Sequence, residues 1–158
     1  MDNQKYMEIA LSLAKKAELN GDIPVGAVVI DENGNVLGKG YNKKEKDKDP
    51  IRHAEMIAIS NASKKIGSWR LENCIIYSTL EPCLMCLGAI LESRINLVVF
   101  GLTSEKFGSV RILDKLKDTK DFNHSINYTY DLTLSSRKTS REMLQSFFNK
   151  LRNQNDII

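Results

Sequence analysis

Two short stretches, Pro50-Ile-Arg-His-Ala-Glu55 and Pro82-Cys-Leu-Met-Cys86, bring one imidazole and two thiols into the same chain. His53, Cys83 and Cys86 match a zinc ligand set of one histidine and two cysteines. Structural zinc sites close their tetrahedron with a fourth side chain, whereas three protein ligands leave a position for water. The sequence therefore predicts a catalytic site with one Zn²⁺ per subunit.

The spacing of these residues favours two helix N-termini that face one metal ion. Cys83 and Cys86 stand three apart after Pro82, so a helix that starts there places both sulfurs on one side of its first turn. The positive end of that helix stabilises thiolates. His53 and Glu55 are two apart, and within a first helical turn both can point toward a metal beyond the helix end.

The predicted chemistry is hydrolytic. Zinc lowers the pKa of bound water toward neutrality, and we expect Glu55 to take the water proton and pass it to the substrate. Attack on a carbon that carries an amino group would give a carbonyl product and ammonia.

Each motif alone has another interpretation. A single Cys-x-x-Cys is more often a redox motif or half of a structural zinc site, and His-x-Glu occurs by chance in many helices. The sequence holds no second Cys-x-x-Cys to complete a structural site. The third cysteine, Cys74, lies in an apolar run and is expected to be an inert core residue.

Length and composition are those of an ordinary globular protein. The chain has 158 residues, 42% hydrophobic and 27% charged, with a formal net charge of +3. We expect a single domain over residues 1–153 and a flexible tail over 154–158. The charge is compatible with a nucleic-acid partner but does not indicate one. We expect no signal peptide, no membrane partner and a cytoplasmic location, since the thiols must stay reduced.

The hydrophobic pattern alternates between helices and strands and predicts an α/β fold. Helical spacing covers about 4–19, the stretch after His53 to about residue 67, the stretch after Pro82, and the chain from residue 140 on. Strands are expected at 25–30, 36–41, 74–79, 97–101 and 126–130, the first two as an antiparallel hairpin and 74–79 joined to 97–101 by a parallel crossover. The predicted fold is a three-layer α/β/α sandwich with a mixed, about five-stranded sheet.

The motifs resemble a known family. His-x-Glu with Pro-Cys-x-x-Cys is the signature of zinc nucleobase deaminases. The chain more specifically resembles the tRNA adenosine deaminases, of the cytidine deaminase-like superfamily, which convert wobble adenosine to inosine. The matching stretches span about residues 4–152: Ile23-Pro-Val-Gly-Ala-Val-Val, Tyr41-Asn, His53-Ala-Glu, Thr79-Leu-Glu-Pro-Cys-Leu-Met-Cys, Ser93-Arg-Ile, Val98-Val-Phe-Gly, Phe122-Asn-His and Phe147-Phe.

This resemblance implies a tRNA anticodon stem-loop as partner, a homodimer, and further site residues. Substrate binding is expected from Asn42, Ala54, Arg52, Asn123 and His124, and contacts with RNA phosphates from Lys106, Arg141, Lys150 and Arg152.

Several of these positions have a second interpretation. Asn42 could simply end a strand, His124 could be a surface residue, and the charged run 43–49 could be a solvated loop. The basic face of the last helix could also be merely solvated. Arg52 and the segment Phe107–Leu113 depart from the pattern of the bacterial members of this family. Both are similar to the catalytic subunit of the eukaryotic two-subunit enzyme. Arg52 could pair with a substrate phosphate, or it could equally be a surface residue without a role.

Three functions are compatible with the sequence. The first is deamination of wobble adenosine in a tRNA anticodon loop, with the base flipped into the pocket. The second is a deaminase of free nucleobases or nucleosides, such as guanine or cytosine. The third is a non-catalytic, zinc-bearing RNA-binding subunit, against which Glu55 argues because a scaffold needs no proton carrier.

Overall fold

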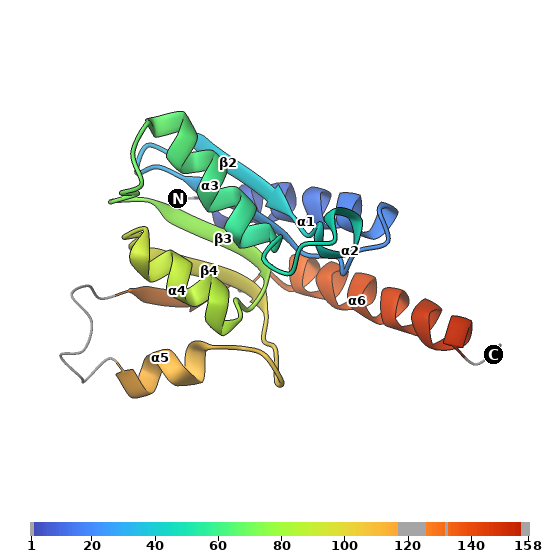
Figure 1. Ribbon diagram of the computed structural model, residues 1–158. Helices are drawn as coiled ribbons and strands as arrows, with labels where there is room; N and C mark the ends of the chain where they lie inside the picture. The colour runs from blue at the N-terminus through green and yellow to red at the C-terminus, as the bar shows by residue number, and fades with distance from the viewer. Residues whose placement is uncertain (1, 117–125, 132, 156–158) are drawn as a thin grey trace.

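The computed structural model describes residues 2–116, 126–131 and 133–155 and shows an α/β sandwich (Figure 1). Its central sheet has five strands in the order β2-β1-β3-β4-β5. Their bounds are β1 Gly26–Ile30, β2 Val36–Tyr41, β3 Ile75–Leu80, β4 Leu97–Leu102 and β5 Asn127–Tyr130. β1 is antiparallel to β2 and β3, whereas β3, β4 and β5 run parallel. The mixed sheet, its hairpin and the parallel crossover are as the sequence predicts.

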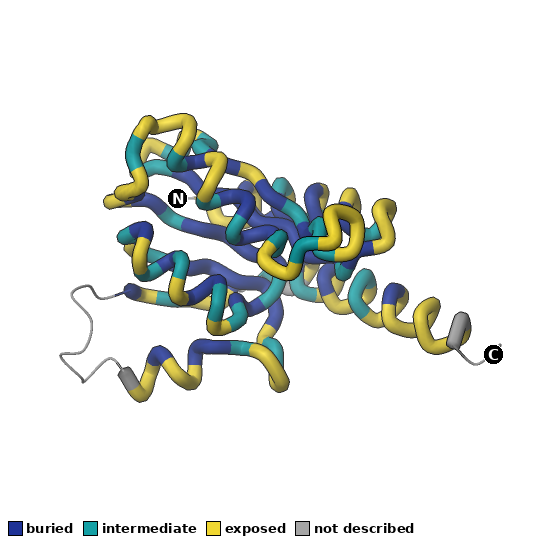
Figure 2. The backbone as a smooth tube through the Cα atoms, in the orientation of Figure 1, coloured by how far each residue is buried: buried dark blue, intermediate teal, exposed yellow. Residues whose placement is uncertain are grey.

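Helices cover both faces of this sheet, which confirms the three layers. On one face lies α1 (Asn3–Leu19), with α6 (Leu134–Asn155) packed beside it. The other face carries α3 (Ala54–Ile66), α4 (Leu84–Glu92) and α5 (Val110–Leu116) (Figure 1). Alternation along β1 sends Val28 and Ile30 toward α1, and Ala27 and Val29 toward α3 and α4, because successive strand residues point to opposite faces. The core strands are accordingly buried on both sides (Figure 2).

Close packing of α3 on β2 fixes where α3 begins. A Cβ at Gly40 would overlap the carbonyl oxygen of Ala54, and one at Gly38 would overlap that of Ala58. The small residues Ala54, Ala58 and Ala62 form the buried face of the helix. Glycine on the strand and alanine on the helix thus let the two backbones approach, and this approach sets the position of the first turn of α3.

Two segments expected to be loops are helical. Within the charged run 43–49, Lys44–Asp47 forms the short helix α2, because the buried carboxylate of Asp22 accepts hydrogen bonds from the backbone N–H groups of Glu45 (2.8 Å) and Lys46 (3.1 Å). The segment after β4, for which the sequence predicts a loop, contains α5, whose Val110 and Leu113 enter the core. Both helices depend on contacts with distant residues, which local pattern does not show.

The last helix also begins earlier than expected. α6 starts at Leu134 instead of residue 140, and it continues to Asn155, two residues into the expected tail. The helical spacing predicts that Leu144, Phe147, Phe148 and Leu151 face the core. This is correct for Phe147, which is buried, but wrong for Phe148 and Leu151, which are 43% and 40% exposed. The reason is that the end of α6 extends past the sheet, so only a narrow stripe of it finds a packing partner (Figure 1). Within the described residues no helix, α6 included, is long and apolar enough to cross a bilayer.

Candidate active site

Three side chains form one compact cluster of metal-binding atoms. The Nδ1 of His53 lies 3.6 Å from each of the sulfurs of Cys83 and Cys86, and the two sulfurs are 3.6 Å apart. A tetrahedron with Zn–N and Zn–S bonds of about 2.0 and 2.3 Å has edges of about 3.5–3.8 Å. The spacing and the donor types therefore fit a zinc ion bound by one imidazole and two thiolates.

Two helix N-termini deliver these ligands, as the sequence predicts. His53 is the residue immediately before α3, and Cys83 holds the same position before α4, each with an extended backbone. The first helical hydrogen bonds run from Ile57 N to His53 O (3.1 Å) and from Leu87 N to Cys83 O (2.8 Å). Cys86 then falls one turn into α4 and is fully buried.

The two thiols and the imidazole shift one another's pKa values. The hydrogen bond between the Cys83 and Cys86 thiols lowers the pKa of Cys83 to about 4, and the hydrogen bond with the His53 ring lowers it further. The same bond raises the pKa of Cys86 above its usual value. The hydrogen bond with Cys83 raises the pKa of His53. The three groups thus interact closely with one another, as the ligands of a single cation must.

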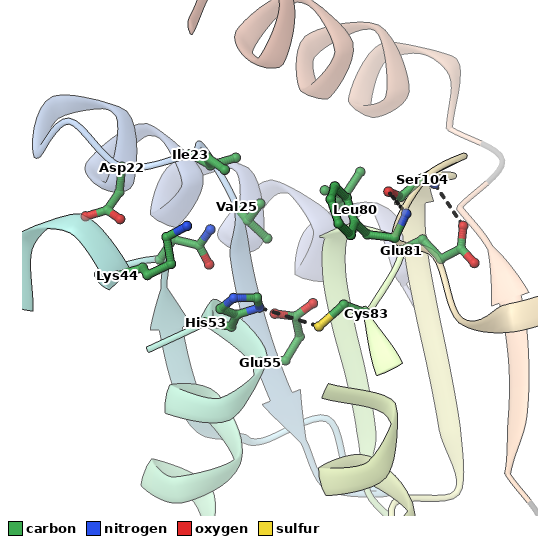
Figure 3. Close-up of a pocket in the computed structure, with 12 residues that line it drawn as sticks. Asp22, Ile23, Val25, Lys44, His53, Glu55, Leu80, Glu81, Cys83 and Ser104 are labelled. Carbon is green, nitrogen blue, oxygen red and sulfur yellow. Dashed lines mark hydrogen bonds between the residues drawn. The ribbon is translucent and has the colours of Figure 1, made fainter. Parts of the chain in front are cut away.

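The carboxylate of Glu55 lies beside the cluster (Figure 3). It is 3% exposed, and burial raises the pKa of its carboxyl group. Its Oε1 accepts a hydrogen bond from the Ser78 hydroxyl at 3.2 Å, whereas Oε2 is buried with no hydrogen-bond partner in the described part of the chain. One oxygen is therefore held in place and the other is free to carry a proton.

Replacing Ser78 by alanine is expected to lower kcat about tenfold while zinc content stays at the wild-type level, since it removes the hydrogen bond that orients Glu55. Thr79, the next residue of β3, accepts a hydrogen bond from Gly26 N with its hydroxyl and supplies the matched control, Thr79→Val. Metal analysis and steady-state kinetics of both variants test this. Equal kcat in Ser78→Ala and wild type would show that the Ser78 hydroxyl does not orient the carboxylate.

The cluster opens into a cavity of about 340 Å³. It is lined by Asp22, Ile23, Val25, Asn42, Lys44, His53, Glu55, Leu80, Glu81, Cys83, Ser104 and Phe107. Asn42 is buried, and its Oδ1 accepts a hydrogen bond from the backbone N–H of Ala54 at 2.9 Å. The amide group of Asn42 thus both fixes the start of α3 and borders the cavity. An asparagine that merely ends a strand would need neither of these positions.

The other predicted site residues lie in varied places. Arg52 Nε donates to Asp47 Oδ2 at 3.0 Å, so its guanidinium pairs with α2. Lys106 and Arg141 are exposed, and Arg141 borders a second hollow with Glu105 and Gln145. Lys150 Nζ lies 3.5 Å from Glu18 of α1.

Arg152 donates to Asn149 on its own helix. Asn123 and His124 fall outside the described residues.

Sequence reasoning missed Ser78, Asp22 and Glu81. Ser78 could have been noticed as a polar residue inside an apolar strand. Asp22 and Glu81 gave no such signal, because their partners lie more than twenty residues away.

Comparison with known proteins identifies the chain. The family model for the cytidine and deoxycytidylate deaminase zinc-binding region matches residues 1–102. The tRNA-specific adenosine deaminase of Haemophilus influenzae is 41% identical over 155 residues, covering 98% of this chain and 88% of the relative. The chain belongs to the tRNA-specific adenosine deaminase family of zinc-binding deaminases. Zinc is thus the cofactor of this family, and His53, Cys83 and Cys86 fit its binding site.

Solved structures of other deaminases share the fold. One, from work on A-to-I editing by tRNA:A34 deaminases at the wobble position of transfer RNA, has a TM-score of 0.80 and 30% identity over 89% of this chain and 99% of that one. A guanine deaminase from Bacillus subtilis has a TM-score of 0.62 and 31% identity over 90% of this chain and 95% of that one. The deaminase fold therefore accommodates more than one kind of nucleobase substrate.

Proposed function

We propose that this protein is a zinc-dependent hydrolase that deaminates adenosine to inosine at the wobble position of a tRNA anticodon loop. The observation that carries the chemistry is the buried Glu55 carboxylate, with one unpartnered oxygen beside three zinc-binding atoms. The substrate is supported by the membership of the chain in a family whose relatives are tRNA-specific adenosine deaminases.

The mechanism assigns one role to each group of the site. His53, Cys83 and Cys86 would hold the zinc ion, which when bound activates a water molecule for attack on C6 of the base. Glu55 takes one proton of that water on Oε2 and delivers it to N1 of the base, and it then moves the proton of the new C6 hydroxyl to the amino group, so that ammonia leaves and a carbonyl remains. The raised pKa of Glu55 suits this task, because a carrier must both accept and release a proton near neutral pH.

The dimensions of the cavity support a flipped nucleotide. A volume of about 340 Å³ is at the lower end of the range for small-molecule sites, so one nucleoside enters but a folded loop does not. The reacting base must therefore leave the stack, which costs least in an unpaired loop. Because Oδ1 of Asn42 already accepts from Ala54 N, the N–H groups of its side-chain amide would donate to that nucleoside.

A second candidate, deamination of a free purine such as guanine, is supported by the likeness to the Bacillus subtilis guanine deaminase. The two candidates separate when the zinc-loaded protein is incubated with an anticodon stem-loop bearing wobble adenosine and, in parallel, with free adenine, adenosine, guanine and cytosine. Inosine formed in the stem-loop alone supports the proposed function. Ammonia released from a free base alone would refute it and establish the second candidate.

Binding of the RNA is expected to weaken steeply with salt. The exposed cations Lys106 and Arg141 lie on or beside the loop that lines the cavity, and each phosphate contact on a single strand contributes a slope of about −0.7 in log K against log salt. Arg141→Ala should therefore weaken binding and flatten the slope by about 0.7. Lys64→Ala is the matched control, because Lys64 is an exposed cation in the last turn of α3, away from the cavity. Fluorescence titrations at four salt concentrations measure both, and equal slopes for the two variants would contradict a phosphate contact at Arg141.

We further propose one deaminase domain that forms a homodimer in the cytoplasm. Ile51 and Leu84, which are 54% and 60% exposed, lie close to His53 and Cys83 in the sequence and support a contact with a second subunit near the site. Light scattering of the purified protein distinguishes a dimer from a monomer of 17.9 kDa.

A further inference from the structure

A loop between β4 and α5, residues 103–109, forms one wall of the cavity. Ser104 and Phe107 of this loop line the cavity together with the zinc-binding residues. Phe107 is nevertheless 75% exposed, so most of its ring has no packing partner in the described chain. A large aromatic side chain thus stands at the rim of the pocket without contributing to the core.

Both ends of this loop are held by one buried carboxylate. Glu81 Oε2 accepts a hydrogen bond from Ser104 N at 2.8 Å, and Oε1 accepts one from Val110 N at 2.9 Å. Glu81 directly precedes Pro82 and the ligand Cys83, and Cys83 pairs with Gly108 in an isolated antiparallel bridge. A Cβ at position 108 would overlap the Glu81 carboxylate, so this approach requires glycine. The loop is thereby fixed to the segment that carries the zinc ligand.

Within the loop, a tight turn presents Phe107. Gly108 N donates to Ser104 O at 2.9 Å, and Phe107 N lies 3.4 Å from the Ser104 hydroxyl oxygen as a donor to it. The backbone of Phe107 is therefore ordered before any ligand arrives, although its ring faces solvent. An ordered, exposed ring binds a flat partner at low entropic cost, because only two side-chain torsions have to be fixed.

We propose that Phe107 is a stacking subsite for the nucleobase adjacent to the one that is deaminated, and that Glu81 is the positioning residue that holds it there. When one base of a single strand enters the cavity, its neighbour stays at the rim and exposes its π-face, which an aromatic side chain can cover. Lys106, exposed on the same turn, adds a positive charge for the connecting phosphate. This inference rests on the proposed function, because only a polynucleotide substrate has a neighbouring base.

Variants at position 107 test the stack. Phe107→Leu is expected to raise KM for the anticodon stem-loop by about 5- to 150-fold, the range for loss of one base–aromatic stack, with kcat within about twofold of wild type. Phe107→Trp should instead keep the wild-type KM, because tryptophan also offers an aromatic face. Zinc content and molar mass should be unchanged in both variants. A Leu variant with wild-type KM, or one that loses zinc or changes its oligomeric state, would overturn the proposal.

Changes in the RNA provide the complementary test. Stem-loops that lack the base on one or the other side of the wobble adenosine remove the proposed partner. One of them should raise KM for the wild type but cause no further rise for Phe107→Leu, since both changes remove the same contact. Equal losses in wild type and variant would refute the stack. Absence of inosine from wild type with the intact stem-loop would instead refute the proposed function, so the two failures are distinguishable.

The role of Glu81 has a readout that needs no substrate. Glutamine can accept from only one of the two loop N–H groups, so Glu81→Gln should speed backbone amide exchange at Ser104 or Val110 at least tenfold and also raise KM for the stem-loop. Glu92→Gln removes the same charge at an exposed site on α4 and should change neither. Unchanged exchange in Glu81→Gln would overturn the positioning role. A variant that loses zinc in proportion to activity would do the same, by assigning Glu81 to the metal site.

Discussion

Replacing Glu55 by alanine is expected to lower kcat by about a hundredfold to ten-thousandfold while the protein keeps one zinc ion per subunit. The carboxylate is the only described acidic group whose buried, unpartnered oxygen lies beside the zinc-binding cluster, and proton transfer by such a group contributes about 10²- to 10⁴-fold to rate. Glu55 is outside the predicted ligand set, so its loss should leave zinc binding intact. Inosine formation and metal analysis of the same preparation provide the measurement.

Glu55→Gln separates the loss of the proton carrier from the cavity that alanine leaves. Glutamine keeps the size of the side chain and can still contact Ser78, yet it cannot carry a proton, so kcat should fall as far as in Glu55→Ala. The Gln variant should also unfold at the same temperature as wild type or higher. The reason is that burial raises the pKa of Glu55, so its ionised form costs stability once the pH exceeds the ordinary carboxyl value. A Gln variant with more than about a tenth of wild-type kcat would remove Glu55 from its proposed role.

Replacing Cys86 by alanine is expected to abolish both zinc binding and activity and to lower stability. Cys86 is fully buried within the first turn of α4 and lies 3.6 Å from both other ligand atoms, so a third ligand cannot be recruited from elsewhere without moving the helix. Because zinc binding energy is also folding energy, the free energy of unfolding should fall by about 3 kcal/mol or more at zinc concentrations a hundredfold above the wild-type dissociation constant.

The chain provides its own control in Cys74. This thiol is also buried, but burial raises its pKa to about 11 and it lies outside the zinc-binding cluster. Cys74→Ala should therefore keep zinc and activity and lose only a small amount of packing. Full zinc occupancy in Cys86→Ala after dialysis against a chelator would refute the ligand set. A chelator should lower the melting temperature of wild type to nearly that of Cys86→Ala, because both then lack the same metal.

Most of the sheet was predictable because its strands are short apolar runs between clear turns. β1 reads as a continuous apolar run, and the structure buries all five of its residues. The turn at Asp31–Gly34 marked the hairpin, since Asp31 accepts hydrogen bonds from the backbone of Asn33 and Asn35. Such signals lie within a few residues of one another, which is the range that local sequence pattern covers.

The elements that were missed obtain their stability from distant partners. α2 consists of Lys, Glu, Lys and Asp and has no apolar face, so nothing local distinguishes it from a solvated loop. Its N–H groups are instead satisfied by Asp22, which precedes it by more than twenty residues. The outward position of Phe148 was equally hidden, because helical spacing does not show where the supporting sheet ends.

The chemical identity of the site follows from the amino-acid sequence alone. Imidazole, thiols and carboxylate at helix N-termini are specified by residue type and by spacings of two and three, which short-range helix geometry converts into position. Tertiary structure alone decided how these groups are tuned and enclosed. Ser78 donates a hydrogen bond to Glu55, 23 residues away in the sequence, and Asp22 caps α2. Glu81 holds the loop that contains Phe107 against the segment that carries Cys83. Hydrogen bonds over such separations exist only once the sheet has brought distant segments together, and no local pattern encodes them.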